Sequence, residues 1–269
     1  MLSLNSIKNY LLINSSLLLF SYIQYKFIIK YNSFINLFGI FFFRNILMER
    51  LMWYGLKNKP YIGEIDRNNK VKYDIKIIML FLVSSTFIET LTHYYISSYY
   101  IYLPTNIIKD LIWFIPISFI YEIIFDLGHY IAHRIEHTNK FLYKYVHKVH
   151  HTYSAPISIL THYHHPLDLI LSNTLPQILA LGIIPQISQF TFSMLVIYKI
   201  FIEISGHTGK IINSSCFPQL MWGPRILGIE LYTEDHDTHH KLNNCNYAKR
   251  FKLWDLIFHT YKMEENNTI

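Results

Sequence analysis

The sequence predicts an all-α protein with several helices that cross a membrane. Of its 269 residues, 51% are hydrophobic and 17% are aromatic, whereas only 16% carry a charge. A typical soluble domain has roughly 25% charged residues, and disordered chains are far less apolar. The few charges also avoid long apolar runs, such as residues 77–88 and 111–121. This composition therefore indicates a folded chain that lies largely in lipid.

The N-terminal part of the chain contains two apolar runs, residues 10–23 and 33–47, each interrupted by polar residues. The first run has polar residues at 14–16, and no Ala-x-Ala-like cleavage site follows it, so a retained segment is favoured over a removed signal peptide. Residues 1–104 are therefore expected to form membrane-associated segments with at least one hairpin. The number of spans stays open, because either run could cross the bilayer or lie on it.

Two hairpins are expected after these runs. Apolar runs at 77–98 and 106–125 form the first hairpin, and runs at 167–185 and 188–205 form the second. Each run is close to the about 20 residues that a helix needs to span a bilayer. Since a hairpin returns the chain to its starting side, the polar segments that flank the hairpins are expected on one face of the membrane.

The basic residues predict which face this is. The turns expected on the opposite side, residues 99–105 and 186–187, contain no Lys or Arg. The positive-inside rule then places the polar segments in the cytosol. The net charge of +6 comes from bases beside apolar runs, where they suit lipid headgroups, which weighs against a nucleic-acid partner. The bases in the polar segments are Arg134, Lys140, Lys144, Lys148, Arg225, Lys241, Lys249, Arg250 and Lys252.

The fifteen histidines gather in repeated short patterns. Residues 129–137 read HYIAHRIEH, residues 147–151 read HKVHH and residues 236–240 read HDTHH. Random placement of the histidines would give about 0.05 copies of HxxHH, so two copies are a strong signal. An isolated histidine, such as His93 or His259, is instead expected to be a packed or surface residue.

Helical geometry predicts where the imidazoles of these blocks point. Residues three or four positions apart share one face of a helix, so each HxxHH block would aim its three imidazoles at one region. The spacing also places His129, His133 and His137 in one stripe. Glu122 and Asp126 continue near that face, where a carboxylate could accept the second N–H of an imidazole. The blocks therefore predict a metal site formed between helices.

Further histidines lie between the second and third blocks and carry weaker evidence. His165 precedes a proline, so it either caps the next helix or binds metal. Glu203 and His207 lie one helical turn apart at the end of an apolar run, where an ionisable pair indicates a functional site. No role is predicted for His162 or His164.

The number of imidazoles suits two metal ions, since a single zinc site needs only four ligands. The sequence lacks HExxH, GxSxG and a glycine-rich phosphate loop, which disfavours a zinc protease, a serine hydrolase and a nucleotide enzyme. A histidine-rich metal-binding or metal-transport protein is the non-enzyme alternative, but a transporter would place its ligands near the bilayer midplane. Cys216 and Cys245 are expected to be packed thiols.

The order HxxxH, HxxHH, HxxHH among hydrophobic segments resembles the membrane-bound fatty acid hydroxylase and sterol desaturase superfamily. The resemblance covers residues 105–262, which are expected to form one domain of this type before a polar tail at 263–269. Ala155 and Pro156 after the second block favour its sterol-modifying branch. One departure occurs after the last block, where the superfamily usually has Trp-Asp-x-x-Phe-Gly-Thr and this chain has His259 in place of the glycine.

The resemblance implies a non-haem di-iron oxygenase with two iron ions as cofactors and O2 as co-substrate. Zinc binds such nitrogens more tightly than ferrous iron, so it could occupy a purified sample. The implied metal ligands are His133, His137, His147, His150, His151, His236, His239 and His240. Additional ligand candidates are His129, His165 and His207, and the carboxylates expected to orient the ligands are Asp126, Glu203 and Asp237. No other catalytic residue is implied.

The implied reaction is the hydroxylation or desaturation of a lipid C–H bond in lipid or steroid biosynthesis. A sterol-like lipid is the favoured substrate, and a fatty-acyl or alkyl lipid is the alternative. Because the chain has no flavin or dinucleotide fingerprint, the resemblance implies cytochrome b5 and its reductase as electron donors. It also implies a location in the endoplasmic reticulum, with the histidine blocks facing the cytosol.

Overall fold

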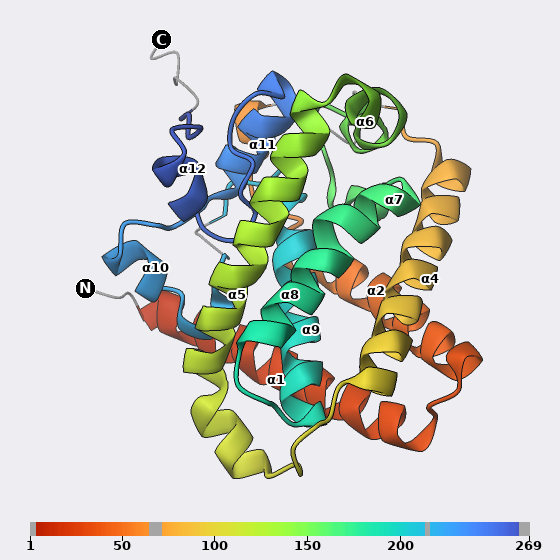
Figure 1. The fold of residues 1–269 in the computed structure, drawn as a ribbon. Coiled ribbons are helices and arrows are strands. Elements are labelled where there is room, and N and C mark those ends of the chain that lie inside the picture. The colour runs from red at the N-terminus through yellow and green to blue at the C-terminus, as the bar shows by residue number, and fades with distance from the viewer. Residues whose placement is uncertain (1–3, 65–71, 213–215, 264–269) are drawn as a thin grey trace.

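The computed structural model describes residues 4–64, 72–212 and 216–263, and these ranges form an all-α fold without β-strands (Figure 1). The predicted fold class is therefore confirmed. Of the predicted polar tail, all but residue 263 lies outside the described residues. The α-helices are α1 (Leu4–Lys30), α2 (Phe34–Gly55), α4 (Ile75–Tyr99), α5 (Ile107–Thr138), α6 (Lys140–Tyr145), α7 (Pro166–Leu169), α8 (Leu175–Ile183), α9 (Gln189–Gly206), α10 (Gly223–Ile226), α11 (Thr233–Leu242) and α12 (Leu253–Ile257). Short 3-10 helices are η1 (Ile62–Glu64), η2 (His147–Thr152), η3 (Ser158–His162) and η5 (Pro218–Leu220), and η4 (Ile170–Thr174) is a π-helix.

Polar residues cap the long helices. Asp74 and Asn106 accept hydrogen bonds from backbone N–H groups in the first turns of α4 and α5. Asn139 ends α5 and also caps α6, so the chain turns directly after the first histidine block. Helix α5 continues through Pro116 over 32 residues. At about 1.5 Å per residue it is longer than the roughly 30 Å hydrocarbon core, so it can cross the core and carry the first block beyond it.

Helix α9 lies at the centre of the bundle and is buried on nearly all sides (Figure 1). Its apolar side chains join Leu17 of α1 and Phe114 and Phe125 of α5 in the main hydrophobic core. Asn14, one of the polar residues that interrupt the first apolar run, accepts a hydrogen bond from the Tyr198 hydroxyl of α9 at 2.9 Å. This polar interruption thus anchors α1 to the central helix.

Four helical segments in the described part of the chain are long and apolar enough to cross a membrane. They are α1, α4, α5 and the stretch from α7 to α8. A protein with several membrane-spanning helices is therefore confirmed. The expected span at 188–205 forms α9, which is not among the four. Its Lys199 and Glu203 lower its hydropathy, and they pair with each other at 3.2 Å inside the bundle.

Helices α5 and α8 approach each other closely at Gly128, directly before the first histidine block. A Cβ atom at this position would lie 3.1 Å from Cβ and 3.2 Å from Cα of Pro176. Close-packed interiors have little room for such a contact without a shift of one helix. Glycine therefore permits the crossing that positions the end of α5.

Candidate metal centre

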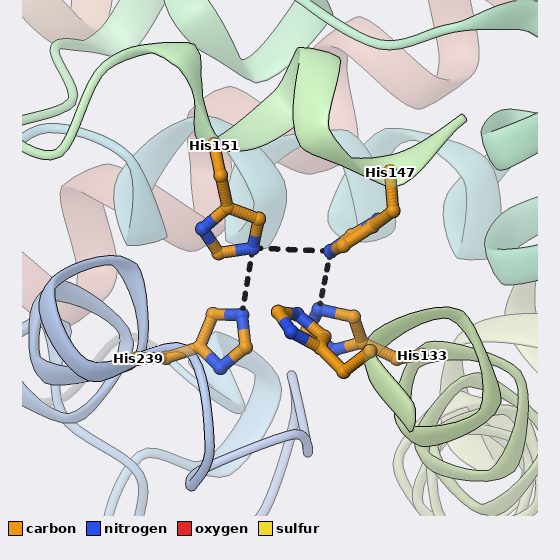
Figure 2. Close-up of side chains that lie close together, drawn as sticks. His133, His147, His151 and His239 are labelled. Carbon is orange, nitrogen blue, oxygen red and sulfur yellow. Dashed lines mark hydrogen bonds between the residues drawn. The ribbon is translucent and has the colours of Figure 1, made fainter. Parts of the chain in front are cut away.

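Nine histidines form two adjoining groups at the end of the bundle where α6 and α11 lie (Figure 1). Within each group, every histidine offers a ring nitrogen that lies within 4.8 Å of those of the other members. We call the groups site A and site B, and Figure 2 shows four members of site A. Site A consists of His133, His137, His147, His151 and His239, and site B consists of His150, His207, His236 and His240.

Each HxxHH block contributes to both sites. In the second block, the first and last histidines belong to site A and the middle one belongs to site B. In the third block this assignment is reversed. The expectation that a block aims all three imidazoles at one region therefore needs a correction. The i and i+4 side chains serve one site, and the i+3 side chain turns to its neighbour.

The Nε2 atoms of neighbouring site A rings face one another. The Nε2 of His147 lies 3.1 Å from that of His133 and 3.1 Å from that of His151 (Figure 2). The Nδ1 of His133 donates to the Tyr247 carbonyl at 2.8 Å, and the Nδ1 of His147 lies 3.3 Å from the Asp168 carboxylate. Since both oxygens can only accept, the protons lie on Nδ1. With these protons on Nδ1, the Nε2 lone pairs of His133 and His147 point at each other.

Facing lone pairs at this distance repel unless a cation lies between them. Nitrogen ligands bound at about 2.0–2.1 Å lie about 2.9–3.4 Å apart around one metal ion. The Nε2 spacing in site B is 3.1 Å between His207 and His236 and 3.2 Å between His236 and His240. The donor sets and spacings of both sites thus fit metal ions.

Backbone carbonyls hold further histidines in the same tautomer. The Nδ1 of His239 donates to the Cys245 carbonyl at 2.7 Å, and the Nδ1 of His207 donates to the Glu203 carbonyl at 2.8 Å. The Nε2 of His239 then lies 3.1 Å from that of His151. Such hydrogen bonds fix the orientation of a ligand ring and raise its basicity. A sequence pattern cannot identify these partners, because they are main-chain atoms.

The setting keeps the imidazoles in the neutral form that binds metal. Burial lowers the pKa of His239 to about 3, although its hydrogen bond to the Cys245 carbonyl opposes this shift. Burial also holds the pKa of His151 and of the four site B histidines well below the ordinary value, and neighbouring imidazoles or Lys249 add to the effect. The rings are therefore unprotonated at neutral pH.

Two carboxylates beside site A were missed by the sequence analysis. Asp168 lies 3.3 Å from the Nδ1 of His147 and 3.1 Å from the Nδ1 of His164. The ring of His164 stacks on that of His150 with their centroids 4.0 Å apart, so Asp168 connects the two sites. Glu136 lies 3.7 Å from the Nδ1 of His147 and forms a third ligand-type cluster with it and Asp168. The spacing of four residues between His164 and Asp168 was the available signal.

The structure places the three additional ligand candidates in different positions. His207 joins site B. His129 belongs to neither group, and its Nδ1 donates to the Ser172 carbonyl at 2.7 Å. His165 is also outside both groups, because its Nδ1 accepts from the N–H of Leu167 at 3.2 Å and caps α7. Of its two expected roles, the structure shows the cap.

The three carboxylates expected to orient ligands make other contacts. Asp126 accepts hydrogen bonds from the backbone N–H groups of 249–251, so it anchors the C-terminal segment instead of an imidazole. The carboxylate of Glu203 pairs with Arg250 at 2.9 Å, and only its backbone carbonyl faces a site B ring. Asp237 forms an ion pair with a lysine one turn further along α11.

Arg250 connects the elements that support both sites. It is fully buried and donates to Glu122 of α5 at 2.8 Å and to Glu203 of α9 at 2.9 Å. A buried charge is tolerated only when it is paired, so removal of one partner would be strongly destabilising. This clamp fixes the C-terminal segment, whose carbonyls hold site A rings, against the two helices that supply His133 and His207.

The departure at His259 has a local consequence. Its φ angle is +56°, in the left-handed region that favours glycine. The turn after α12 still forms with histidine, but with some backbone strain. This conformation gives a physical reason for the glycine that the superfamily usually has here.

The fold and the two sites define a helical membrane protein of the histidine-box class. The profile of the fatty acid hydroxylase family matches residues 118–260, more than half of the chain and a range that includes every histidine of both sites. The chain therefore belongs to the fatty acid hydroxylase family. The resemblance predicted from the histidine blocks is confirmed.

Several curated proteins are similar to this chain. The C-4 methylsterol oxidase of Schizosaccharomyces pombe is 30% identical over 158 residues, which cover 58% of this chain and 50% of that protein. Sphinganine C4-monooxygenase 2 of Arabidopsis thaliana is 31% identical, with 52% and 51% covered. A very-long-chain aldehyde decarbonylase of Oryza sativa subsp. indica is also 31% identical, with 52% of each chain covered. The chain thus spans about half the length of these relatives, and no solved structure matches it.

Proposed function

We propose that the protein is a membrane-bound di-iron oxidoreductase that uses O2 and externally supplied electrons to hydroxylate or desaturate a lipid C–H bond. The observation that carries this proposal is the convergence of nine imidazoles from separate segments into two adjoining sites with Nε2 spacings of 3.1–3.2 Å. A sterol-like lipid, oxidised in lipid or sterol biosynthesis, is the favoured substrate.

The histidines of site A and site B are the proposed ligands of one iron each. Bound iron would supply the redox chemistry with O2 that side chains lack. Zinc competes well for imidazole ligands, so the iron must be supplied before purification. Hydroxylation consumes one O2, two electrons and two protons, and it yields the alcohol and one water. Desaturation consumes the same reactants and yields two waters.

The protein's own side chains and carbonyls would bind the metal ions and orient the ligand rings. Neutral imidazoles provide Nε2 lone pairs, and the Tyr247, Cys245 and Glu203 carbonyls hold the opposite ring nitrogens. The Asp168 carboxylate does the same for His147. Because site B is entirely buried, its surroundings also exclude bulk water from the reacting region.

The proposed electron donors are cytochrome b5 and its reductase, and the proposed location is the endoplasmic reticulum with the histidine blocks in the cytosol. Two features support this arrangement. The segments that carry the blocks are basic, which suits an acidic electron-transfer partner. Their lysines and arginines also follow the positive-inside rule.

A fatty-acyl or alkyl-lipid hydroxylase is the second candidate. The similarity to a sphinganine monooxygenase supports it, because the identity of 31% is close to the 30% of the methylsterol oxidase. The histidine sites serve either substrate class equally well. Metal transport has less support, because the segments that carry the nine histidines lie together near one end of the bundle.

A comparative lipid profile tests the proposed function. Wild type and His239→Ala would be expressed with cytochrome b5 and its reductase, and sterols and acyl lipids would be resolved together. A sterol product that requires His239 supports the favoured substrate, and an acyl product supports the second candidate. An unchanged profile, with both proteins equally expressed and metal bound to the wild type, would contradict the oxidoreductase proposal.

A further inference from the structure

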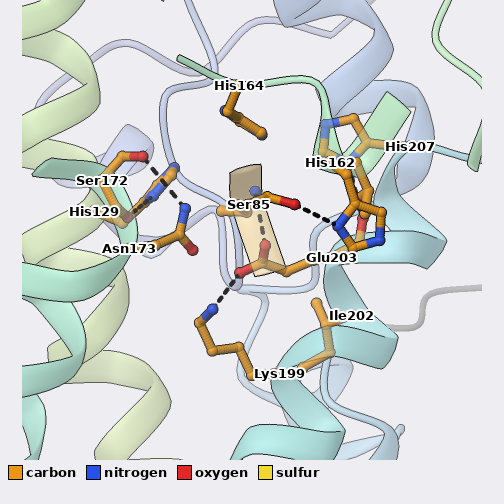
Figure 3. Close-up of polar contacts among 12 residues, drawn as sticks. Ser85, His129, His162, His164, Ser172, Asn173, Lys199, Ile202, Glu203 and His207 are labelled. Carbon is orange, nitrogen blue, oxygen red and sulfur yellow. Dashed lines mark hydrogen bonds and ion pairs between the residues drawn. The ribbon is translucent and has the colours of Figure 1, made fainter. Parts of the chain in front are cut away.

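A polar cavity of about 80 Å³ lies inside the bundle next to site B. Its walls come from α2, α4, η3, η4 and α9, and they include Ser85, Glu89, His162, Asn173 and Lys199. Figure 3 shows several of these side chains around one space, with His164 and His207 nearby. Ionisable groups between membrane-spanning helices are costly and indicate a functional site.

The charges in this cavity are internally paired. Glu89 forms a bidentate pair with Arg44 at 2.6 Å. Lys199 pairs with Glu203 at 3.2 Å (Figure 3). Glu203 also pairs with Arg250 at 2.9 Å and with Lys249 at 3.5 Å. Each charged residue of the wall therefore already has an ion-pair partner inside the protein, although three cations share Glu203. A neutral ligand would leave these pairs intact.

The cavity also presents polar atoms that the protein leaves unsatisfied. Within the described residues, the Nε2 of His162 and the Oδ1 of Asn173 have no hydrogen-bond partner, although each residue is only 7% exposed. The opposite ring nitrogen of His162 contacts the Ser85 hydroxyl at 3.3 Å (Figure 3). A buried polar atom without a partner is destabilising. A hydroxyl group, which donates and accepts, can satisfy either of these atoms.

The cavity wall contacts a proposed metal ligand. The hydroxyl of Thr161 and the carbonyl of Glu203 lie 3.0 Å and 2.8 Å from the Nδ1 of His207. The other nitrogen of that ring belongs to site B, 3.1 Å from the Nε2 of His236. A group bound in the cavity is thus separated from site B by about one imidazole ring.

We propose that this cavity binds the hydroxyl-bearing end of the lipid substrate, with the unpartnered Asn173 Oδ1 or His162 Nε2 as its hydrogen-bond partner. This inference rests on the proposed function and adds the part of the substrate that is recognised. At about 80 Å³ the cavity is far smaller than the roughly 300–1,000 Å³ of a pocket that encloses a drug-sized ligand, so the hydrocarbon body lies outside it. The carbon atoms next to the hydroxyl are then nearest to the histidines. Water offers the same chemistry and is the competing occupant.

Equilibrium binding to the full chain in phosphatidylcholine nanodiscs tests the proposal without turnover. The probes are tritiated cholestanol with its hydroxyl-free counterpart cholestane, and hexadecanol with hexadecane. The wild type is expected to bind the hydroxylated member of at least one pair about tenfold more tightly or better, the usual effect of leaving buried polar groups unpaired. Asn173→Leu or His162→Leu is expected to reduce that preference to less than about threefold, which identifies the partner.

Two controls separate this inference from its alternatives. Gln219→Leu removes a buried amide that has no hydrogen-bond partner among the described residues and lies outside the cavity, so the preference should persist. His239→Ala should abolish lipid oxidation and leave the preference intact, so failure of the proposed function is distinguishable from failure of the cavity. Unchanged melting temperatures of the two cavity variants would show that they fold. Equal binding of both members of each pair, no binding of any probe, or a preference that both cavity variants retain would overturn the proposal and leave water as the occupant.

Discussion

Sites A and B are built from the same histidine blocks but differ in ligand number and enclosure. Site A has five histidines, two of them partly exposed, and carboxylates behind His147. Site B has four, all buried, and its His207 contacts the wall of the polar cavity. A six-coordinate ion would therefore keep more open positions in site B. Site A is thus the more saturated site, and site B faces the proposed substrate end.

Removal of one ligand from each site has the largest expected effect. His239→Ala in site A and His240→Ala in site B should each reduce lipid oxidation at least about 100-fold, because loss of a direct ligand exceeds the effect of a lost outer partner. Each variant should also lose metal from its own site. Product formation and metal per chain measure the two effects.

His165→Ala is the matched control for these variants. This histidine caps α7 and belongs to neither site, so activity should stay within about twofold and metal content should not change. If His165→Ala lost as much metal as His239→Ala, the separation of site ligands from the other histidines would be wrong.

Asp168→Asn should weaken metal binding at site A more than at site B. Both imidazole N–H groups face the same carboxylate oxygen, and the neutral amide removes the negative charge that strengthens these two hydrogen bonds. Metal affinity at site A should fall about 10–100-fold, as for other outer partners, with little change at site B. Competition with a chelator measures both affinities. Asp110→Asn, which changes a carboxylate bonded to Ser188 outside the sites, is the control. Equal losses at both sites would indicate a general structural effect.

The cavity beside site B should make stability depend on pH. Burial lowers the pKa of His162 from 6.5 to about 4. As the pH falls below 6.5, the unfolded chain takes up the proton first, so the free energy of unfolding decreases until about pH 4, by at most about 1.4 kcal/mol per pH unit. The melting temperature of His162→Leu should therefore fall less than that of the wild type between pH 7 and pH 5. The same fall in melting temperature in both proteins would show that His162 does not cause the pH dependence.

Relief of strain at His259 should give the smallest effect. His259→Gly removes the cost of a left-handed side-chain residue but adds flexibility to the unfolded chain, so the net gain should be about 0–1 kcal/mol. Metal content at site A should not change. Gly228→Ala, at φ +68°, should instead lower the melting temperature. Destabilisation by His259→Gly would show that the histidine side chain has a role of its own.

The sequence predicted membrane helices and eight of the histidines that the structure brings together. Hydropathy marked α1, α4, α5 and α7–α8, and also α9, which is not among the four candidate spans, while the i, i+3, i+4 spacing marked the blocks. The division of each block between two sites was not predictable, since it depends on how η2 and α11 face each other. His207 was only a candidate, because it stands alone in the sequence.

The supporting contacts escaped prediction for a different reason. The Tyr247 and Cys245 carbonyls are main-chain atoms, and Asp168 reaches His147 across 21 positions of the chain. Asp126 has the helical spacing of a ligand-orienting carboxylate, yet its oxygens satisfy the backbone N–H groups of 249–251. Only tertiary structure decides between such partners.

The most direct test of the central claim is the number of metal ions per chain. The wild type would be purified from iron-supplied cells, and iron and zinc would be quantified together by elemental mass spectrometry. Two ions per chain are expected, falling to one in His239→Ala with site B still loaded. A folded wild-type protein that binds one ion or none, whichever metal is supplied, would contradict it.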